Sequence, residues 1–225
     1  MRNPPRGYKP AGWEPTAAQA ASRSGRDLTL KEALRTWQWW ALWALLFLNT
    51  SAGISVISQE APMFMEISRV TAIAAAGMVG IASIGNAVGR VFWAWLSDIV
   101  TRRYAFVLMY AIQVILFWIL PFTHAPALLT VVTFLILMCY GGGFGTMPAF
   151  TADYFGARNV GPIYGLMLTA WSFASVFGPI LLARLRESTG VYSGALHLIA
   201  FGLLISIVLP LVIRPPRPAL VEAPV

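Results

Sequence analysis

The stretch that decides the fold reads Gly85-Asn-Ala-Val-Gly89-Arg90-Val-Phe-Trp-Ala-Trp-Leu-Ser-Asp98, and Arg102-Arg103 follow it. It begins inside an apolar run long enough to cross a membrane and leaves that run through an acid and two arginines. An arginine inside hydrocarbon is costly, so its first interpretation is a functional residue that faces protein or water. Gly85 and Gly89 form a small-xxx-small pair, which lets a second helix approach the backbone closely.

The composition extends this conclusion to the whole chain. Of its 225 residues, 58% are hydrophobic and only 11% are charged, and the mean hydropathy is +0.69. These values are typical of an integral membrane protein in contact with the lipid bilayer. The net charge of +7 would suit a nucleic-acid partner. We exclude that partner, because the basic residues cluster at the ends of apolar runs.

Apolar stretches near the roughly 20 residues that cross a bilayer occur six times along the chain. The sequence therefore predicts an all-α membrane protein with six transmembrane helices in one bundle over residues 37–213. A basic, proline-rich cytosolic linker is expected at 1–36 and a cytosolic tail at 214–225. The predicted spans are Trp37–Ser58, Thr71–Trp95, Tyr104–Phe122, Ala127–Met147, Gly161–Ala183 and Ala195–Ile213.

The distribution of lysine and arginine predicts the orientation. With the amino terminus inside, the cytosolic segments hold 12 of these residues and the outer loops hold 3, with Arg90 counted in the membrane. Because positive charge gathers on the cytosolic side, both termini are expected there, and a bacterial inner membrane is the expected location. The tryptophans from Trp37 to Trp43 form an aromatic belt at the inner interface.

Arg90 has two interpretations. It lies eight residues before Asp98, about 12 Å from the cytosolic end of its helix, so its side chain could reach the inner surface. Alternatively, it is a fixed positive charge facing a cavity, on the same face as Asn86. A planar guanidinium there would match both oxygens of a carboxylate substrate. The residues alone leave both interpretations open.

Asp98 is expected to pair with Arg102 or Arg103 at the inner end of the helix, or to meet the amino-terminal dipole of a neighbouring helix. One interpretation is a purely structural ion pair. The same chemistry would serve as a contact that changes between the states of a gate, so these three residues are candidates for a conformational role.

A glycine-rich run closes the fourth predicted span: Tyr140-Gly-Gly-Gly-Phe144-Gly-Thr-Met-Pro148. Four glycines within five residues are costly in an ordinary helix, but they suit a place where helices cross closely or where a helix must bend. Gly141, Gly145 and Pro148 are therefore candidate conformational residues. Tyr140 and Phe144 are one turn apart and share a face, which either packs in the core or lines a cavity.

For other polar positions in the spans, structural interpretations come first. Asn49 and Gly53 share a helix face, for which we expect interhelical hydrogen bonding, with a cavity lining as the alternative. Gly178-Pro179 predicts a kink. His124 and His197 are far apart and lack metal-ligand spacing. With no nucleophile–base arrangement either, the sequence predicts no enzyme, no cofactor and no metal.

The run from Gly89 to Arg103 resembles the loop signature of the major facilitator superfamily, roughly G-x-L-x-D-R-x-G-R-R. It is similar to the second copy of that signature, which joins the eighth and ninth helices. Ala94 stands for the first glycine, Ile99 for the basic residue and Thr101 for the second glycine.

Three further motifs are similar to those of the oxalate/formate antiporter family of that superfamily. The resemblance covers nearly the whole chain. It implies that the six spans form the carboxyl-terminal half of a transporter that works by alternating access. The motifs are Asn3-Pro-Pro-Arg-Gly-Tyr8-x-Pro10-x-Gly12-Trp13, Tyr140–Phe150, and Asp153-Tyr-Phe-Gly-x-Arg158-Asn159-x-Gly161 with Tyr164-Gly-Leu and Thr169-Ala170.

The resemblance also implies substrate-binding residues. In oxalate-carrying relatives, the arginine that matches Arg90 and a lysine after Thr-Ala in the eleventh helix bind the two carboxylates, among aromatic residues that match Tyr140 and Phe144. Trp171 stands at the lysine position, so the second cation is missing. This favours a monocarboxylate or another small organic anion, with protons as a candidate coupling ion.

One six-helix bundle implies a partner against which it moves. We weigh three explanations. The first, which we favour, is a fragment or a mis-started reading frame; the second is pairing with a separately encoded amino-terminal half; the third is a homodimer. A different class of function also stays open: a non-transporting, regulatory membrane protein derived from a transporter half.

Overall fold

The structure is a computed structural model that describes residue 12 and residues 27–216. Most of the predicted linker, nearly all of the motif at residues 3–13, and the tail from residue 217 lie outside the described residues. Within the described part the chain is helical: α2 (Leu30–Leu34), α3 (Trp37–Ser68), α4 (Ala72–Val100), α5 (Arg102–Ile119), the 3₁₀ turn η1 (Leu120–Phe122), α6 (Pro126–Phe155), α7 (Val160–Met167), α8 (Thr169–Thr189), α9 (Tyr192–Ser206) and α10 (Val208–Val212).

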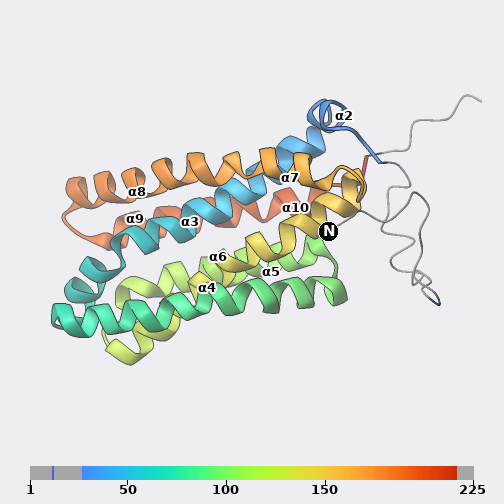
Figure 1. The fold of residues 1–225 in the computed structure, drawn as a ribbon. Helices are drawn as coiled ribbons and strands as arrows, with labels where there is room; N and C mark the ends of the chain where they lie inside the picture. Colours follow the sequence, from blue (N-terminus) through green and yellow to red (C-terminus); the bar gives the residue numbers. More distant parts are fainter. Residues whose placement is uncertain (1–11, 13–26, 217–225) are drawn as a thin grey trace, which may run out of the picture.

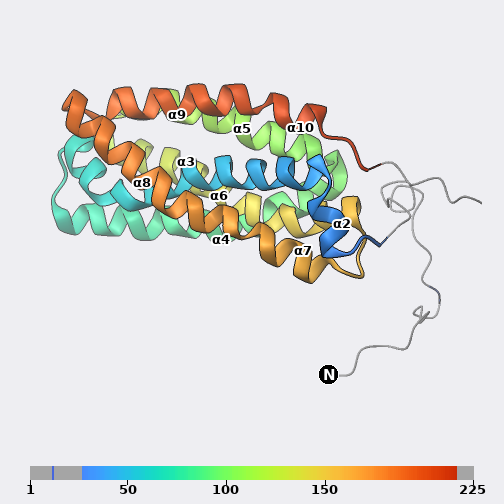
Figure 2. The ribbon, with the colours of Figure 1, turned by 90° about the horizontal axis from the view of Figure 1, so that it is seen from above.

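These elements form six membrane spans, which confirms the predicted class of fold. Each has the length and composition to cross a membrane. The spans are α3, α4, α5 with η1, α6, α7 with α8, and α9 with α10. Figures 1 and 2 show them side by side along one common direction, with α5 and α9 on one face and α4, α7 and α8 on the opposite face. The helices α3 and α6 lie between, and they are the most buried of the six spans.

The first and fourth spans are longer than the sequence indicated. Instead of ending at Ser58, α3 continues to Ser68, and α6 continues past Met147 to Phe155. Polar residues beyond Ser58 end the apolar run, but tertiary contacts hold them in the helix. The Tyr192 hydroxyl, for example, donates to Gln59 Oε1 at 3.2 Å.

The fifth span has an interruption that the sequence did not predict, in addition to the Gly178-Pro179 step for which a kink was predicted. The helix α8 runs without a break through Gly178 and Pro179, whereas the chain leaves regular α-helix at Leu168, between α7 and α8. Gly178 serves close packing, since a Cβ added there would meet the carbonyl oxygen of Ser51 in α3 at 2.6 Å.

Glycines bring α4 and α6 into backbone contact. A Cβ added at Gly85 would overlap the carbonyl of Phe134, and one at Gly89 would overlap that of Met138. From the other side, Gly141 and Gly145 of α6 meet the carbonyls of Asn86 and Arg90. The helix α6 remains continuous through these glycines and through Pro148. Close crossing, one of the two alternatives for the glycine run, is therefore what the structure shows.

A buried polar network joins three helices in the core. The Asn49 side-chain amide of α3 donates to the carbonyls of Cys139 and Tyr140 in α6, at 3.4 and 3.3 Å. Gln113 of α5 donates to Asn49 Oδ1 at 2.7 Å. The Tyr110 hydroxyl, also in α5, donates to the Leu45 carbonyl at 2.7 Å. The expected interhelical hydrogen bonding by Asn49 is confirmed.

Candidate functional site

Arg90 lies at the centre of an aromatic cluster built by three helices. Its guanidinium carbon is 5.5 Å from the ring centroid of Phe144, across the α4–α6 crossing. Phe144 meets Tyr140 edge to face at 5.3 Å and meets Trp171 of α8 in the same way at 6.0 Å. The charge of Arg90 also acts on the phenols of Tyr140 and Tyr164. The structure thus gathers four sequence-predicted residues into one cluster and adds Tyr164.

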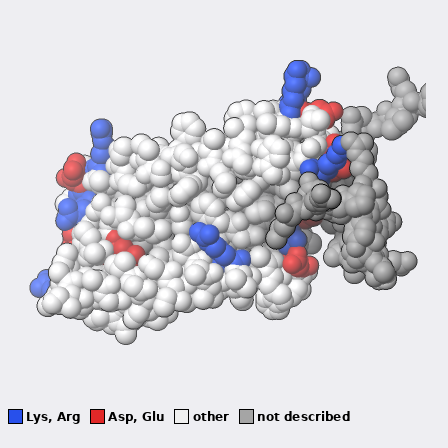
Figure 3. Space-filling model, in the orientation of Figure 1, with Lys and Arg blue, Asp and Glu red and all other residues white. Residues whose placement is uncertain are grey.

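The cluster opens on the face formed by α4, α6, α7 and α8. Arg90 and Trp171 are exposed there, and Phe144 is half-buried. Figure 3, in the orientation of Figure 1, shows most lysine and arginine at the two ends of the bundle. One further blue patch lies midway along this face, and one red patch lies between it and one end. Among the described residues, no acid pairs with Arg90. An unpaired guanidinium at this depth is equipped to bind an anion.

Asn86 lies one turn before Arg90 but is directed differently. Its Oδ1 atom is buried against Gly141 of α6 and has no hydrogen-bond partner in the described part of the chain. Asn86 and Arg90 lie on the same side of α4. The side-chain oxygen of Asn86, however, is packed into the α4–α6 crossing.

Asp98, Arg102 and Arg103, which are candidate conformational residues, belong to an ion cluster at the end of the bundle where α10 ends. Arg102 pairs with Asp98 one turn earlier, as the sequence predicted for one of the two arginines. Its Nε also meets Asp153 Oδ2 of α6 at 3.3 Å. Arg103 donates through Nε to the Pro210 carbonyl of α10 at 2.9 Å. These contacts tie α4, α5, α6 and α10 together beneath the aromatic cluster.

The α4–α5 connection has an unusual backbone at Thr101. Its φ is 75° and its ψ is 150°, a conformation that glycine adopts readily and a β-branched residue does not. Thr101 is the residue that stands where the superfamily signature has its second glycine. The sequence departs from the signature here, but the backbone keeps a glycine-like conformation.

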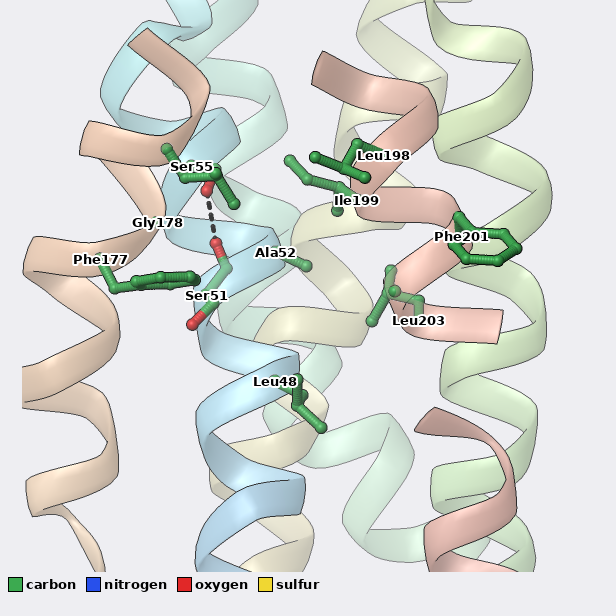
Figure 4. A pocket seen from close by; sticks show the side chains of 12 residues that line it. Leu48, Ser51, Ala52, Ser55, Phe177, Gly178, Leu198, Ile199, Phe201 and Leu203 are labelled. Atoms are coloured by element: carbon green, nitrogen blue, oxygen red, sulfur yellow. Dashed lines mark hydrogen bonds between the residues drawn. The ribbon is translucent and has the colours of Figure 1, made fainter. Parts of the chain in front are cut away.

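A separate hollow of about 230 Å³ lies between α3, α8 and α9. Figure 4 shows Ser51 and Ser55 of α3 facing it together with Ile199 and Leu203 of α9. Its lining has two hydroxyls. Ser55 Oγ donates to the Ser51 carbonyl at 2.6 Å, and Ser51 Oγ has no hydrogen-bond partner in the described structure. With no charged side chain in its lining, it does not suit an anion.

Two residues near these features were missed from the sequence. Tyr164 had been quoted only as part of a motif, and Glu60 lay beyond the predicted end of the first span. Glu60 is 2% exposed in α3, and its Oε1 has no hydrogen-bond partner in the described part of the chain. Its spacing of seven residues from Gly53 was the available signal, because residues seven apart share a helix face.

Comparison with known proteins identifies the class. The sequence matches the Major Facilitator Superfamily over residues 1–179 and 75–225, so the chain belongs to this superfamily of membrane transporters. The integral-membrane class and the superfamily inferred from the loop signature are confirmed.

Three relatives within the superfamily are similar in sequence to the chain. The chain is 25% identical to the oxalate:formate antiporter of Oxalobacter formigenes over 73% of its own length and 40% of the relative's. It is 28% identical to apicoplast pyruvate carrier 1 of Toxoplasma gondii, over 72% and 31%. It is 26% identical to the uncharacterized MFS-type transporter YhjX of Escherichia coli K12, over 67% and 38%. The chain thus spans two-fifths or less of the length of these relatives.

Proposed function

We propose that the chain is the anion-binding half of a transporter for a small organic anion, with Arg90 as the ligand of the substrate carboxylate. The observation that carries the proposal is an exposed guanidinium, unpaired within the described residues, at the centre of a three-helix aromatic cluster. Fork-shaped donors fit the two oxygens of a carboxylate, and the low local dielectric strengthens that interaction.

The aromatic residues restrict what else enters the site. Phe144 and Trp171 place apolar ring surface beside Arg90 and carry no second positive charge. A substrate with one carboxylate and a small apolar body leaves no charge unpaired, whereas a dicarboxylate leaves one. We therefore place monocarboxylates such as formate, acetate, lactate and pyruvate ahead of oxalate. The relatives named for oxalate:formate exchange and for pyruvate support this range.

The proposed mechanism is alternating access, in which this bundle rocks against a second one around a midplane site. The helices α4 and α8 carry the least buried spans and present an apolar face beside Arg90. That face would receive an amino-terminal half or a second copy of the chain. The ion cluster of Asp98, Arg102 and Asp153 is the proposed inner gate contact, and the α4–α6 glycine crossing is its pivot.

Both termini are proposed to lie in the cytosol. Gln38, near the start of α3, donates to the Arg214 carbonyl at 3.2 Å, so the two ends of the bundle sequence meet at one end of the molecule. Arg102 and Arg103 at the start of α5 and Arg158 in the α6–α7 connection lie at the same end, which fits positive charge on the cytosolic side.

Uptake into liposomes tests the function. The chain is reconstituted alone and together with an amino-terminal half, and uptake of radiolabelled formate, acetate, lactate, pyruvate and oxalate is compared. Arg90→Gln and Arg90→Lys should abolish uptake without affecting insertion, whereas Arg35→Gln, an exposed arginine at the inner end, should leave it unchanged. Uptake that does not depend on Arg90 contradicts the assigned role. Insertion without any uptake in either arrangement favours the non-transporting, regulatory alternative.

A further inference from the structure

A carboxyl group buried in the outer part of the bundle has no role in the anion site. Glu60 lies in α3 and is 2% exposed, and its Oε1 has no hydrogen-bond partner among the described residues. It lies eight residues before the end of α3 at Ser68, about 12 Å from the outer end of that helix. The group is thus held within the bundle and not at its solvent-facing end.

The position of Glu60 relates it to the substrate cluster. Gly53 packs directly on the ring of Tyr140, and Asn49 bonds to the backbone of α6 one turn earlier. Glu60 follows Gly53 by seven residues, so it lies on the same side of α3, about 10 Å farther out. One helix face therefore carries both the packing partner of the aromatic cluster and the buried acid.

No positive charge neutralises this acid within the described structure. Three neighbouring helices have no ionisable side chain in their outer parts. These parts are residues 72–89 of α4, 111–119 of α5 and 126–138 of α6. The ionisable groups at this end come from the α3 terminus, the loops, α8 and α9, and among them Arg186 is paired with Glu66 at 2.6 Å. They are Glu66, Arg69, His124, Arg184, Arg186, Glu187, Tyr192 and His197. The Tyr192 hydroxyl donates to Gln59, the residue before Glu60, at 3.2 Å, and the Tyr192 ring lies 4.9 Å from the guanidinium carbon of Arg186.

An unpaired carboxylate in such surroundings is costly, and binding a proton removes the cost. We propose that Glu60 is the proton-binding site that couples anion transport to protons; this rests on the proposed function of the Arg90 site. In the conformation described, Glu60 carries the proton as a neutral carboxylic acid. When the bundles rock and water reaches α3, the O–H bond breaks and the proton passes to water, and a proton from the opposite side restores the acid in the next half-cycle.

The charge balance of this cycle suits a monocarboxylate. The substrate brings one negative charge to Arg90 and the proton brings one positive charge to Glu60. Anion and proton then cross together with no net charge moved. The empty carrier returns with Arg90 positive and Glu60 negative, so the return step also moves no net charge.

Infrared spectroscopy tests the proton without requiring transport. In liposomes at neutral pH, the wild-type chain should show the C=O band of a protonated, poorly hydrated carboxylic acid, and Glu60→Gln should lack it. Glu66→Gln is the matched control, because Glu66 lies in the same helix but is exposed and ion-paired; it should keep the band. Spectra of the wild type and Glu60→Gln that are identical in this region overturn the proposal.

Two modes of acetate and pyruvate movement test the coupling. A proton gradient should drive accumulation by the wild type at least about tenfold above Glu60→Gln, whereas exchange of labelled for unlabelled anion should agree within about twofold. Equal gradient-driven accumulation by both overturns the proposal. Loss of exchange and accumulation with Arg90→Gln, alongside normal exchange with Glu60→Gln, supports both sites. Absence of both modes in the wild type contradicts the proposed function instead, and the infrared band still decides whether Glu60 holds a proton.

Discussion

The guanidinium of Arg90 lies over the ring of Phe144, with 5.5 Å between Cζ and the ring centroid. The contact crosses from α4 to α6 at the level where glycines bring the two backbones together. A cation held over an aromatic face keeps its edge donors free for a second partner. The helix crossing therefore fixes the direction of the charge as well as the packing of the bundle.

Replacing Phe144 should weaken anion binding without abolishing it. Phe144→Leu removes the ring face that positions Arg90, and a cation–π contact at an exposed site contributes about 0.5–1 kcal/mol, or roughly two- to fivefold in Kd. Phe144→Tyr keeps the ring and should bind nearly as well as the wild type. Phe201→Leu, an exposed aromatic on α9, is the control and should leave Kd unchanged. Binding is measured by equilibrium dialysis with radiolabelled pyruvate.

The α4–α6 crossing should not accept a methyl group at Gly89. Gly89→Ala drives Cβ into the Met138 carbonyl, and overpacking of this kind costs about 1–3 kcal/mol. Gly80→Ala in the same helix is the control, because nothing lies within 4 Å of an added Cβ there. It should be neutral or slightly stabilising. The buried Cys139 is the chain's only cysteine, so the onset of its labelling by a thiol-reactive dye on heating reports unfolding. Equal melting temperatures for the two variants would contradict close crossing.

Thr101→Gly should stabilise the protein. Thr101 has a φ of 75°, and a conformation of this kind costs a non-glycine residue about 1–3 kcal/mol, part of which glycine returns as unfolded-state entropy. We expect a net gain of about 1 kcal/mol in the same thermal assay. Gly156→Ala provides the opposite test at a φ of 90° in the α6–α7 connection and should lower the melting temperature. A destabilised Thr101→Gly variant would contradict the prediction, because contacts of the threonine side chain would then outweigh its backbone strain.

The hydrogen bond between Gln113 and Asn49 should appear as a coupling energy. The two side chains meet at 2.7 Å in the core, and interhelical polar contacts in membrane proteins average about 0.6 kcal/mol, with about 1.7 as an upper value. A double-mutant cycle with Asn49→Leu and Gln113→Leu measures the term directly. Additive effects would mean that the bond contributes nothing beyond packing.

The class of fold was predictable because each apolar run is long enough to cross a bilayer by itself. The spacing of Tyr140 from Phe144 and the ion pair of Asp98 with Arg102 also followed from helical periodicity. The convergence of Trp171 on Phe144 did not, since it depends on how α8 packs; the sequence placed Trp171 near Arg90 only through a family resemblance.

The carboxyl-terminal end of α3 could not be predicted from the sequence. Ser58, Gln59, Glu60 and Pro62 end the apolar run, so local reasoning ends the span there. The helix continues because one side of this segment, with Glu60, Met63 and Phe64, is buried against neighbouring helices.

Neither glycine nor proline occupies the break at Leu168. Beside it, the Thr169 hydroxyl donates to the Leu166 carbonyl at 2.8 Å and accepts from Trp43 Nε1 of α3 at 2.9 Å.

The most direct test of the central claim is the affinity of the chain for a carboxylate with and without Arg90. Binding of radiolabelled pyruvate, formate and oxalate to the chain in lipid nanodiscs is measured for the wild type, Arg90→Lys, Arg90→Gln and the Arg35→Gln control. We predict that the wild type and Arg35→Gln bind at least one monocarboxylate equally. Arg90→Gln should bind it at least about tenfold more weakly, because a charge-assisted, fork-shaped pair is lost, and Arg90→Lys should recover little of that loss. Equal affinity in the wild type and Arg90→Gln would contradict the assignment of Arg90 as the anion ligand.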